Sequence, residues 1–234
     1  MPHEIIIGCY EQHLLGFTYP ELKPSFTSKQ HNSPVRTLDI NQESSMLASA
    51  GIDEQVYLIN LKNRREYGAL FGHSGSVNQV KFAENGSLYS ASDDGLMIHW
   101  KNVKVPGSKK KSWEKMGQVS GKVKAVNSKA KIEDSKFVSI GIHPSSNLAI
   151  LGNAGAKGLD IVDLINEKVV ASKRLRGKGK KQQLDVPNFV EFTPDGQKMV
   201  IFSEPATLRC KGIDGNDVWK VASELRNGFE MENV

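Results

Sequence analysis

The sequence predicts an all-β protein built from a repeated unit of short antiparallel strands. An apolar pattern at positions i, i+3 and i+5, followed by a turn sequence, recurs four times along the 234 residues. Alternating side chains between turn signals are typical of antiparallel strands. The dipeptide Asn85-Gly86 is a strong hairpin signal, because both residues tolerate a positive φ. The apolar positions of the four copies are Val35, Leu38, Ile40; Val77, Val80, Phe82; Phe137, Ile140, Ile142; and Pro187, Val190, Phe192.

The spacing of the four copies is that of a repeat protein. Their starts are separated by 42, 60 and 50 residues, and repeats of about 40–45 residues are typical of four-stranded propeller blades. The second and third copies are longer by about the length of two lysine-rich insertions. We therefore expect one domain over residues 1–234, with repeat units at approximately residues 31–72, 73–134, 135–184 and 185–223.

The second unit carries the fullest set of signature residues. It has a Gly-His pair at His73, a turn that contains Asp94, and an end at Trp100. This set resembles the WD-repeat signature of a Gly-His pair, a turn Asp and a final Trp-Asp, with Lys101 in place of the last Asp. The resemblance implies a buried structural hydrogen-bond network of Trp100, Ser90, His73 and Asp94.

That network satisfies the polar groups of all its members. An indole N–H only donates, a hydroxyl donates and accepts, a neutral imidazole does one of each, and a carboxylate accepts. Every group therefore finds a partner, as a buried polar network requires. We expect His73 to be architectural rather than catalytic.

The other units match the signature less well. The first has His31, Ser49 and Asp53 at matching positions, but Ile59 stands where the Trp would be. The third has Gly155 near the Asp position and ends in Val162-Asp163, and the fourth keeps little beyond the strand pattern. The resulting prediction is a partial WD40 β-propeller of about four blades plus an N-terminal closing strand.

Segments outside the generic signature resemble a more specific group of WD-repeat proteins. The resemblance covers roughly Ile5 to Leu164, and four segments are similar to the p21-activated kinase-interacting protein family. They are Gly8–Phe17, Glu66–Gly75, Asp93–Trp100 and Ile142–Ala149. In such a propeller Ile5–Tyr10 pairs with a C-terminal blade, which this sequence lacks, so either the sequence is partial or the closure is altered.

The family resemblance implies a function. Members are nucleolar factors that act in assembly of the large ribosomal subunit, and animal members are described as negative regulators of p21-activated kinase. The resemblance thus implies a scaffold for ribosome biogenesis in the nucleus and nucleolus, with pre-ribosomal proteins and rRNA as partners. The alternative is a regulator that binds the kinase directly, and a third hypothesis is a WD adaptor for unrelated partners.

The positive charge of the chain is concentrated in two segments. The net charge is +5, but residues 101–136 carry +8 and residues 168–181 carry +7, so the rest of the chain carries −10. We expect these segments to form loops, either solvated or contacting RNA phosphates, since lysine suits sequence-independent phosphate binding. Trp113 could stack on a base or pack within a strand. The candidate RNA-contacting residues are Lys109, Lys110, Lys111, Lys173, Arg174, Arg176, Lys178, Lys180 and Lys181.

Near matches to enzyme motifs fail on particular residues. The segment from Gly72 to Ser76 lacks the final Gly of a nucleophile elbow. Gln182 follows the lysines where a phosphate-binding loop needs Ser or Thr. Cys9 and Cys210 form no metal-binding spacing, and no apolar stretch is long enough to cross a bilayer. We therefore expect no catalytic residues, cofactor, metal, membrane contact or small-molecule substrate.

Overall fold

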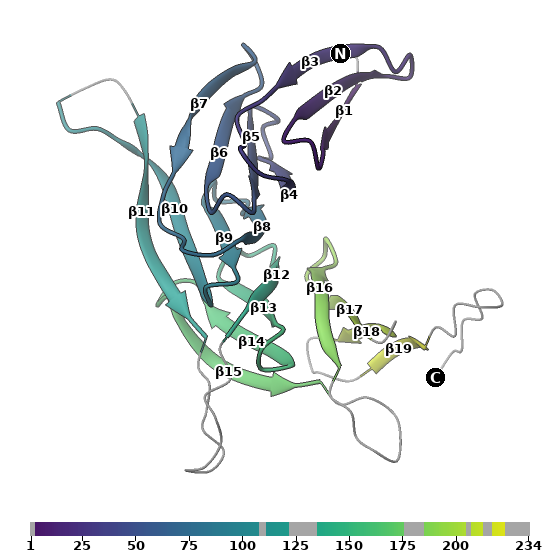
Figure 1. Cartoon of the computed structure of the whole chain (residues 1–234). Coiled ribbons are helices and arrows are strands. Elements are labelled where there is room, and N and C mark those ends of the chain that lie inside the picture. Colours follow the sequence, from purple (N-terminus) through teal and green to yellow (C-terminus); the bar gives the residue numbers. More distant parts are fainter. Residues whose placement is uncertain are drawn as a thin grey trace. The chain divides into compact units, whose positions relative to one another are not determined.

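The computed structural model describes residues 3–107, 111–121, 135–175, 185–204, 207–212 and 217–222 (Figure 1). Within these ranges the regular elements are strands, arranged as one three-stranded and four four-stranded sheets. Within each sheet, every strand pairs with the next one along the chain. The prediction of an all-β protein made of WD40-type blades is confirmed.

The four-stranded sheets, here called blades 1 to 4, begin at the four predicted apolar patterns. Blade 1 contains β4 (Val35–Ile40), β5 (Met46–Gly51), β6 (Val56–Asn60) and β7 (Arg65–Leu70). Blade 2 contains β8 (Val77–Phe82), β9 (Leu88–Ser92), β10 (Leu96–Lys104) and β11 (Lys111–Ser120). Blade 3 contains β12 (Phe137–Ile142), β13 (Leu148–Asn153), β14 (Gly158–Asp163) and β15 (Lys168–Arg174). Blade 4 contains β16 (Val186–Phe192), β17 (Lys198–Glu204), β18 (Thr207–Gly212) and β19 (Asp217–Ala222).

A bulge in the first strand of each blade explains the spacing of the apolar pattern. In blade 2 the pairing register shifts between Val77 and Gln79, and the first strands of the other three blades shift at the corresponding place. One extra residue reverses the alternation of side chains across the strand. Val77 and Val80 can therefore both be buried, although they lie an odd number of positions, three, apart.

The turns after these first strands share one backbone feature. Each contains a residue in the left-handed region of φ. This residue is Ser44 in blade 1, Gly86 in blade 2, Ser146 in blade 3 and Gly196 in blade 4. The predicted Asn85-Gly86 turn is confirmed, since Gly86 has a φ of 79° and the Asn85 side chain accepts a bond from the amide of Ser87. Glycine adopts this conformation without a steric cost.

The N-terminal residues form a sheet rather than a lone closing strand. It consists of β1 (His3–Gly8), β2 (Leu14–Tyr19) and β3 (Pro24–Ser28). A tight turn makes this possible, because Cys9 N donates to His13 O at 3.0 Å and Gln12 takes a positive φ of 70°. The turn contains no Gly or Pro, so the sequence pattern did not reveal it.

The chain divides into two compact units, each with its own core. The first contains residues 1–94 and 98–117, and the second contains residues 95–97 and 118–234. In the first unit Leu14, Leu47 and Ile59 are fully enclosed and join the N-terminal sheet to blade 1. In the second unit a cluster around Ile150 and Val190 joins blades 3 and 4.

Candidate interaction site

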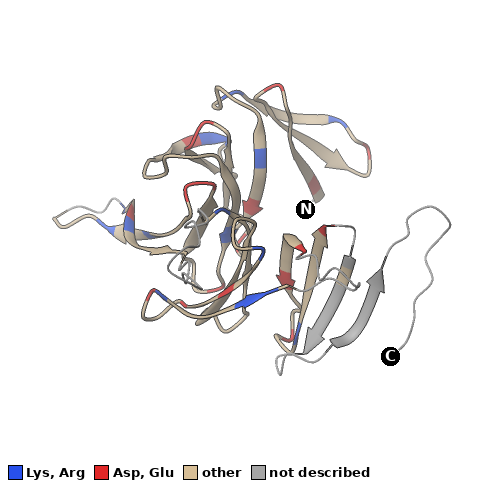
Figure 2. Ribbon diagram, turned by 60° about the horizontal axis from the view of Figure 1, so that its bottom comes forward, with Lys and Arg blue, Asp and Glu red and all other residues tan. Residues whose placement is uncertain are grey.

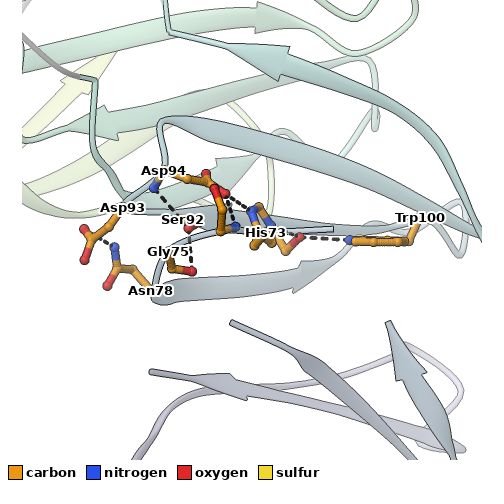
Figure 3. A network of polar contacts seen from close by, with 9 residues as sticks. His73, Gly75, Asn78, Ser92, Asp93, Asp94 and Trp100 are labelled. Carbon is orange, nitrogen blue, oxygen red and sulfur yellow. Dashed lines mark hydrogen bonds and ion pairs between the residues drawn. The ribbon is translucent and has the colours of Figure 1, made fainter. Parts of the chain in front are cut away.

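The predicted residues of blade 2 form a continuous hydrogen-bonded chain (Figure 3). The Nδ1 atom of His73 lies 2.9 Å from Asp94 Oδ2, and its Nε2 atom lies 2.7 Å from Ser90 Oγ. The indole N–H of Trp100 donates to the same hydroxyl oxygen at 2.8 Å. Every proton has an acceptor when Nδ1–H donates to Asp94 and the Ser90 hydroxyl donates to Nε2. The chain thus connects β9, β10 and the turn between them with the loop before the blade.

The Ser-His-Asp arrangement of blade 2 is enclosed. Ser90 is fully buried and Trp100 is only 3% exposed. A nucleophilic serine needs a hydroxyl that a substrate can approach, whereas the Ser90 oxygen is bonded on one side to His73 and on the other to Trp100. The geometry therefore indicates a structural role for this network.

Blade 1 repeats most of this network without the tryptophan. His31 contacts Asp53 Oδ2 at 2.8 Å and Ser49 Oγ at 2.9 Å, which confirms that these residues occupy matching positions. Ile59 is buried in the core, as expected of the residue that replaces Trp. The ring of Tyr57 packs edge-on against His31 with centroids 4.6 Å apart. Burial, followed by the charges of Asp53 and Glu66, raises the pKa of Tyr57.

Blade 3 uses a different polar network, which the sequence did not reveal. Asn153 donates to Asp160 at 2.9 Å, and Ser172 donates to the other carboxylate oxygen at 2.5 Å. Asp160 and Ser172 are direct partners across β14 and β15, so the only sequence signal is a carboxylate within an apolar strand. The predicted final residue Asp163 instead accepts bonds from the turn amides of Ile165 and Asn166.

The candidate RNA-contacting residues that the structure describes lie in strands rather than in the predicted loops. Lys111 begins β11, while Lys173 and Arg174 end β15. Both are edge strands of their sheets, and lysine is favoured on edge strands because its charge discourages pairing with another chain. Figure 2 shows acidic residues interspersed with the basic ones along the described ribbon. The remaining candidates lie outside the described residues: Lys109, Lys110, Arg176, Lys178, Lys180 and Lys181.

Trp113 packs within β11, the second of the two roles considered for it. Its ring meets Phe82 edge-on with centroids 6.0 Å apart. The Nε1 atom is buried, and it has no hydrogen-bond partner within the described part of the chain. An unsatisfied buried donor is uncommon and costs stability.

A groove of about 440 Å³ lies between β7 and β11 in the first unit. One wall comes from blade 1 and the other from the start of β11, and the Tyr67 hydroxyl joins them by donating to Lys111 O at 3.0 Å. Tyr67 is the extra residue of a bulge, since Leu58 pairs with Gly68 whereas Ile59 pairs with Glu66. The lining consists of Leu58, Tyr67, Gly68, Ala69, Leu70, Lys111, Ser112 and Trp113.

The described residues contain no group of three His, Cys, Asp or Glu side chains that could hold a metal ion. Among the same residues, no helix has the length and apolarity needed to span a membrane.

Comparison with known proteins identifies the repeats. The family model "WD domain, G-beta repeat" matches residues 22–60 and 64–101, which contain the four strands of blade 1 and, in blade 2, β8, β9 and most of β10. The chain is 27% identical to the p21-activated protein kinase-interacting protein 1-like of Gallus gallus, over 84% of this chain and 47% of that protein. The Xenopus laevis protein of the same name is 26% identical over 85% of this chain and 48% of its own length.

A fungal relative also matches. Protein MAK11 of Saccharomyces cerevisiae is 25% identical over 62% of this chain and 37% of its own length. The chain spans about half the length of the two vertebrate relatives. The predicted similarity to the p21-activated kinase-interacting proteins is confirmed.

Proposed function

We propose that this WD-repeat chain, which is similar to the p21-activated kinase-interacting proteins, is a non-enzymatic scaffold that acts in large ribosomal subunit assembly in the nucleolus. The main support is the similarity to those relatives over 84% of the chain. The segments that resemble this family in the sequence imply the same process. The proposed partners are pre-ribosomal proteins and rRNA.

The polar networks support a scaffold rather than an enzyme. Buried hydrogen-bond networks fasten the strands within blades 1, 2 and 3. Hydrogen bonds of this kind restrict the movement of the strands that they join, although Asp53 Oδ1 in blade 1 is buried without a partner among the described residues. A rigid set of sheets presents its edges and turns to partners without needing any chemical step.

Contacts with RNA are proposed for the basic residues. Lys111, Lys173 and Arg174 lie on edge strands, and both Lys111 and Lys173 are exposed. Lysine and arginine contact phosphates independently of base sequence, with release of counterions. We expect binding to RNA to weaken steeply as salt rises.

A sucrose gradient of nuclear extract tests the assembly role. The full chain, carrying an epitope tag, should sediment with large-subunit precursors, and ribonuclease treatment should return it to the light fractions. The tagged, full-length relative from Gallus gallus, run on the same gradient, is the control. If neither protein leaves the light fractions, the assembly function is wrong.

Direct binding to p21-activated kinase is the second candidate function. The names of the vertebrate relatives favour it. Pull-down with purified kinase separates it from the first function. Retention of kinase together with sedimentation in the light fractions alone would favour kinase regulation over ribosome assembly.

A further inference from the structure

The geometry points to the groove between β7 and β11 as a docking site for an extended acidic peptide segment of a partner protein. This goes beyond the proposed function, because it assigns a protein-binding surface. Lys111, proposed above as an RNA contact, would here face an acidic peptide instead. Its argument rests on three features: the origin of the groove, its two edge strands and the charge of its lining.

The bulge at Tyr67 creates the groove. Because of the bulge, the Tyr67 side chain departs from the regular alternation of side chains along β7, and its hydroxyl reaches the backbone of β11. The next residue, Gly68, has a φ of 155°, and a Cβ atom built on it would meet nothing within 4 Å. The wall of the groove is therefore open backbone at this point.

Both walls contain an edge strand. Within the described sheets β7 pairs only with β6, and β11 pairs only with β10. Edge strands present backbone N–H and C=O groups along their free side. An extended peptide can bind such groups while its alternate side chains enter pockets. The volume of about 440 Å³ suits two or three residues of such a peptide.

The lining has positive charge and hydrogen-bond donors without a carboxylate. Lys111 is exposed and lines the groove, and none of the eight lining residues is Asp or Glu. Trp113 also lines it, but its indole N–H is buried. A carboxylate bound here would accept from the Lys111 ammonium, while the partly exposed ring of Tyr67 would cover an apolar neighbour.

Fluorescence anisotropy with a labelled Glu-Val-Glu-Val peptide, blocked at both ends, tests the site. The full chain should bind this peptide, and a Lys-Val-Lys-Val peptide should not compete. Lys111→Glu should weaken binding by about tenfold or more, as reversing a charge at a contact does. Lys168→Glu is the matched control, because it changes net charge equally from the start of β15, outside the groove, and it should leave binding unchanged.

A second variant is a control for the buried part of the lining. Trp113→Phe keeps an aromatic ring and removes an N–H that solvent does not reach, so it should leave peptide binding and circular dichroism unchanged. Equal loss in Lys111→Glu and Lys168→Glu would show general charge attraction and overturn the site. Absence of peptide binding, or displacement of the peptide by oligouridylate, would overturn it too. These outcomes are independent of the sucrose gradient, which tests ribosome assembly alone.

Discussion

Replacing Trp100 by Phe removes one hydrogen-bond donor and part of a buried ring from blade 2. The indole N–H donates to Ser90 Oγ at 2.8 Å, and both side chains are enclosed. Losing this bond costs about 1 kcal/mol, because Ser90 keeps its bond to His73. The smaller ring leaves a void that costs about 1 kcal/mol more, at roughly 24 cal/mol per Å³. We therefore expect the free energy of unfolding to fall by about 2 kcal/mol.

Urea titration and calorimetry of the full chain measure this loss. A loss of about 2 kcal/mol corresponds to a fall of about 4–8 °C in Tm for a chain of this length. Trp113→Phe is the matched control, because it removes the same atoms from an indole whose N–H has no partner among the described residues. It should cost at least about 1 kcal/mol less than Trp100→Phe.

A double-mutant cycle decides whether the bond itself contributes. Ser90→Ala and Trp100→Phe act on the same pair of atoms, so their effects should not add, and a coupling energy of about 1 kcal/mol is expected. Unchanged stability of Trp100→Phe, or strict additivity in the cycle, would refute the structural role assigned to the network.

Three further changes test other parts of the molecule. Asp160→Ala removes the closer acceptor of the buried Asn153 amide, which keeps only the bond to Ser135 Oγ at 3.3 Å, and should lower the free energy of unfolding by about 2 kcal/mol in urea titration. Side-chain and backbone bonds from Asn166 lower the pKa of Asp163, so its stabilising effect is present above about pH 4 and is lost as pH falls through the folded pKa; Asp163→Asn should flatten acid unfolding curves in that range. Replacing both Lys173 and Arg174 by Gln should reduce the slope of log affinity for single-stranded RNA against log salt by roughly 0.7 per lost contact, and an unchanged slope would remove these residues from the RNA surface.

The blades were predictable because their defining residues are close in sequence. The i, i+3, i+5 pattern locates the first strand of every blade, and the bulge between Val77 and Gln79 gives the physical cause of that spacing. The signature around His73 identified the whole network of blade 2, since its four members lie at fixed distances from one another along the chain. The corresponding residues of blade 1 could be assigned by comparing its sequence with that of blade 2, although blade 1 lacks the tryptophan.

Features that depend on strand pairing were not predictable. The network of Asn153, Asp160 and Ser172 exists only because β13, β14 and β15 lie in one register, and no signature residue marks it. Lysine content suggested loops, but Lys173 lies in an edge strand, where solvent covers one side of the backbone. The groove beside Tyr67 likewise depends on a bulge that the sequence does not mark.

The lysines on the edge strands also govern how copies of the chain behave toward one another. An edge such as β15 could add a strand from a second copy, but antiparallel pairing of two β15 strands would bring like charges together. The repulsion is screened at high salt and cancelled by a bound polyanion. High salt or bound nucleic acid would therefore permit association between copies of the chain. Several copies bound along one RNA would contact one another more readily than copies in dilute solution at low salt.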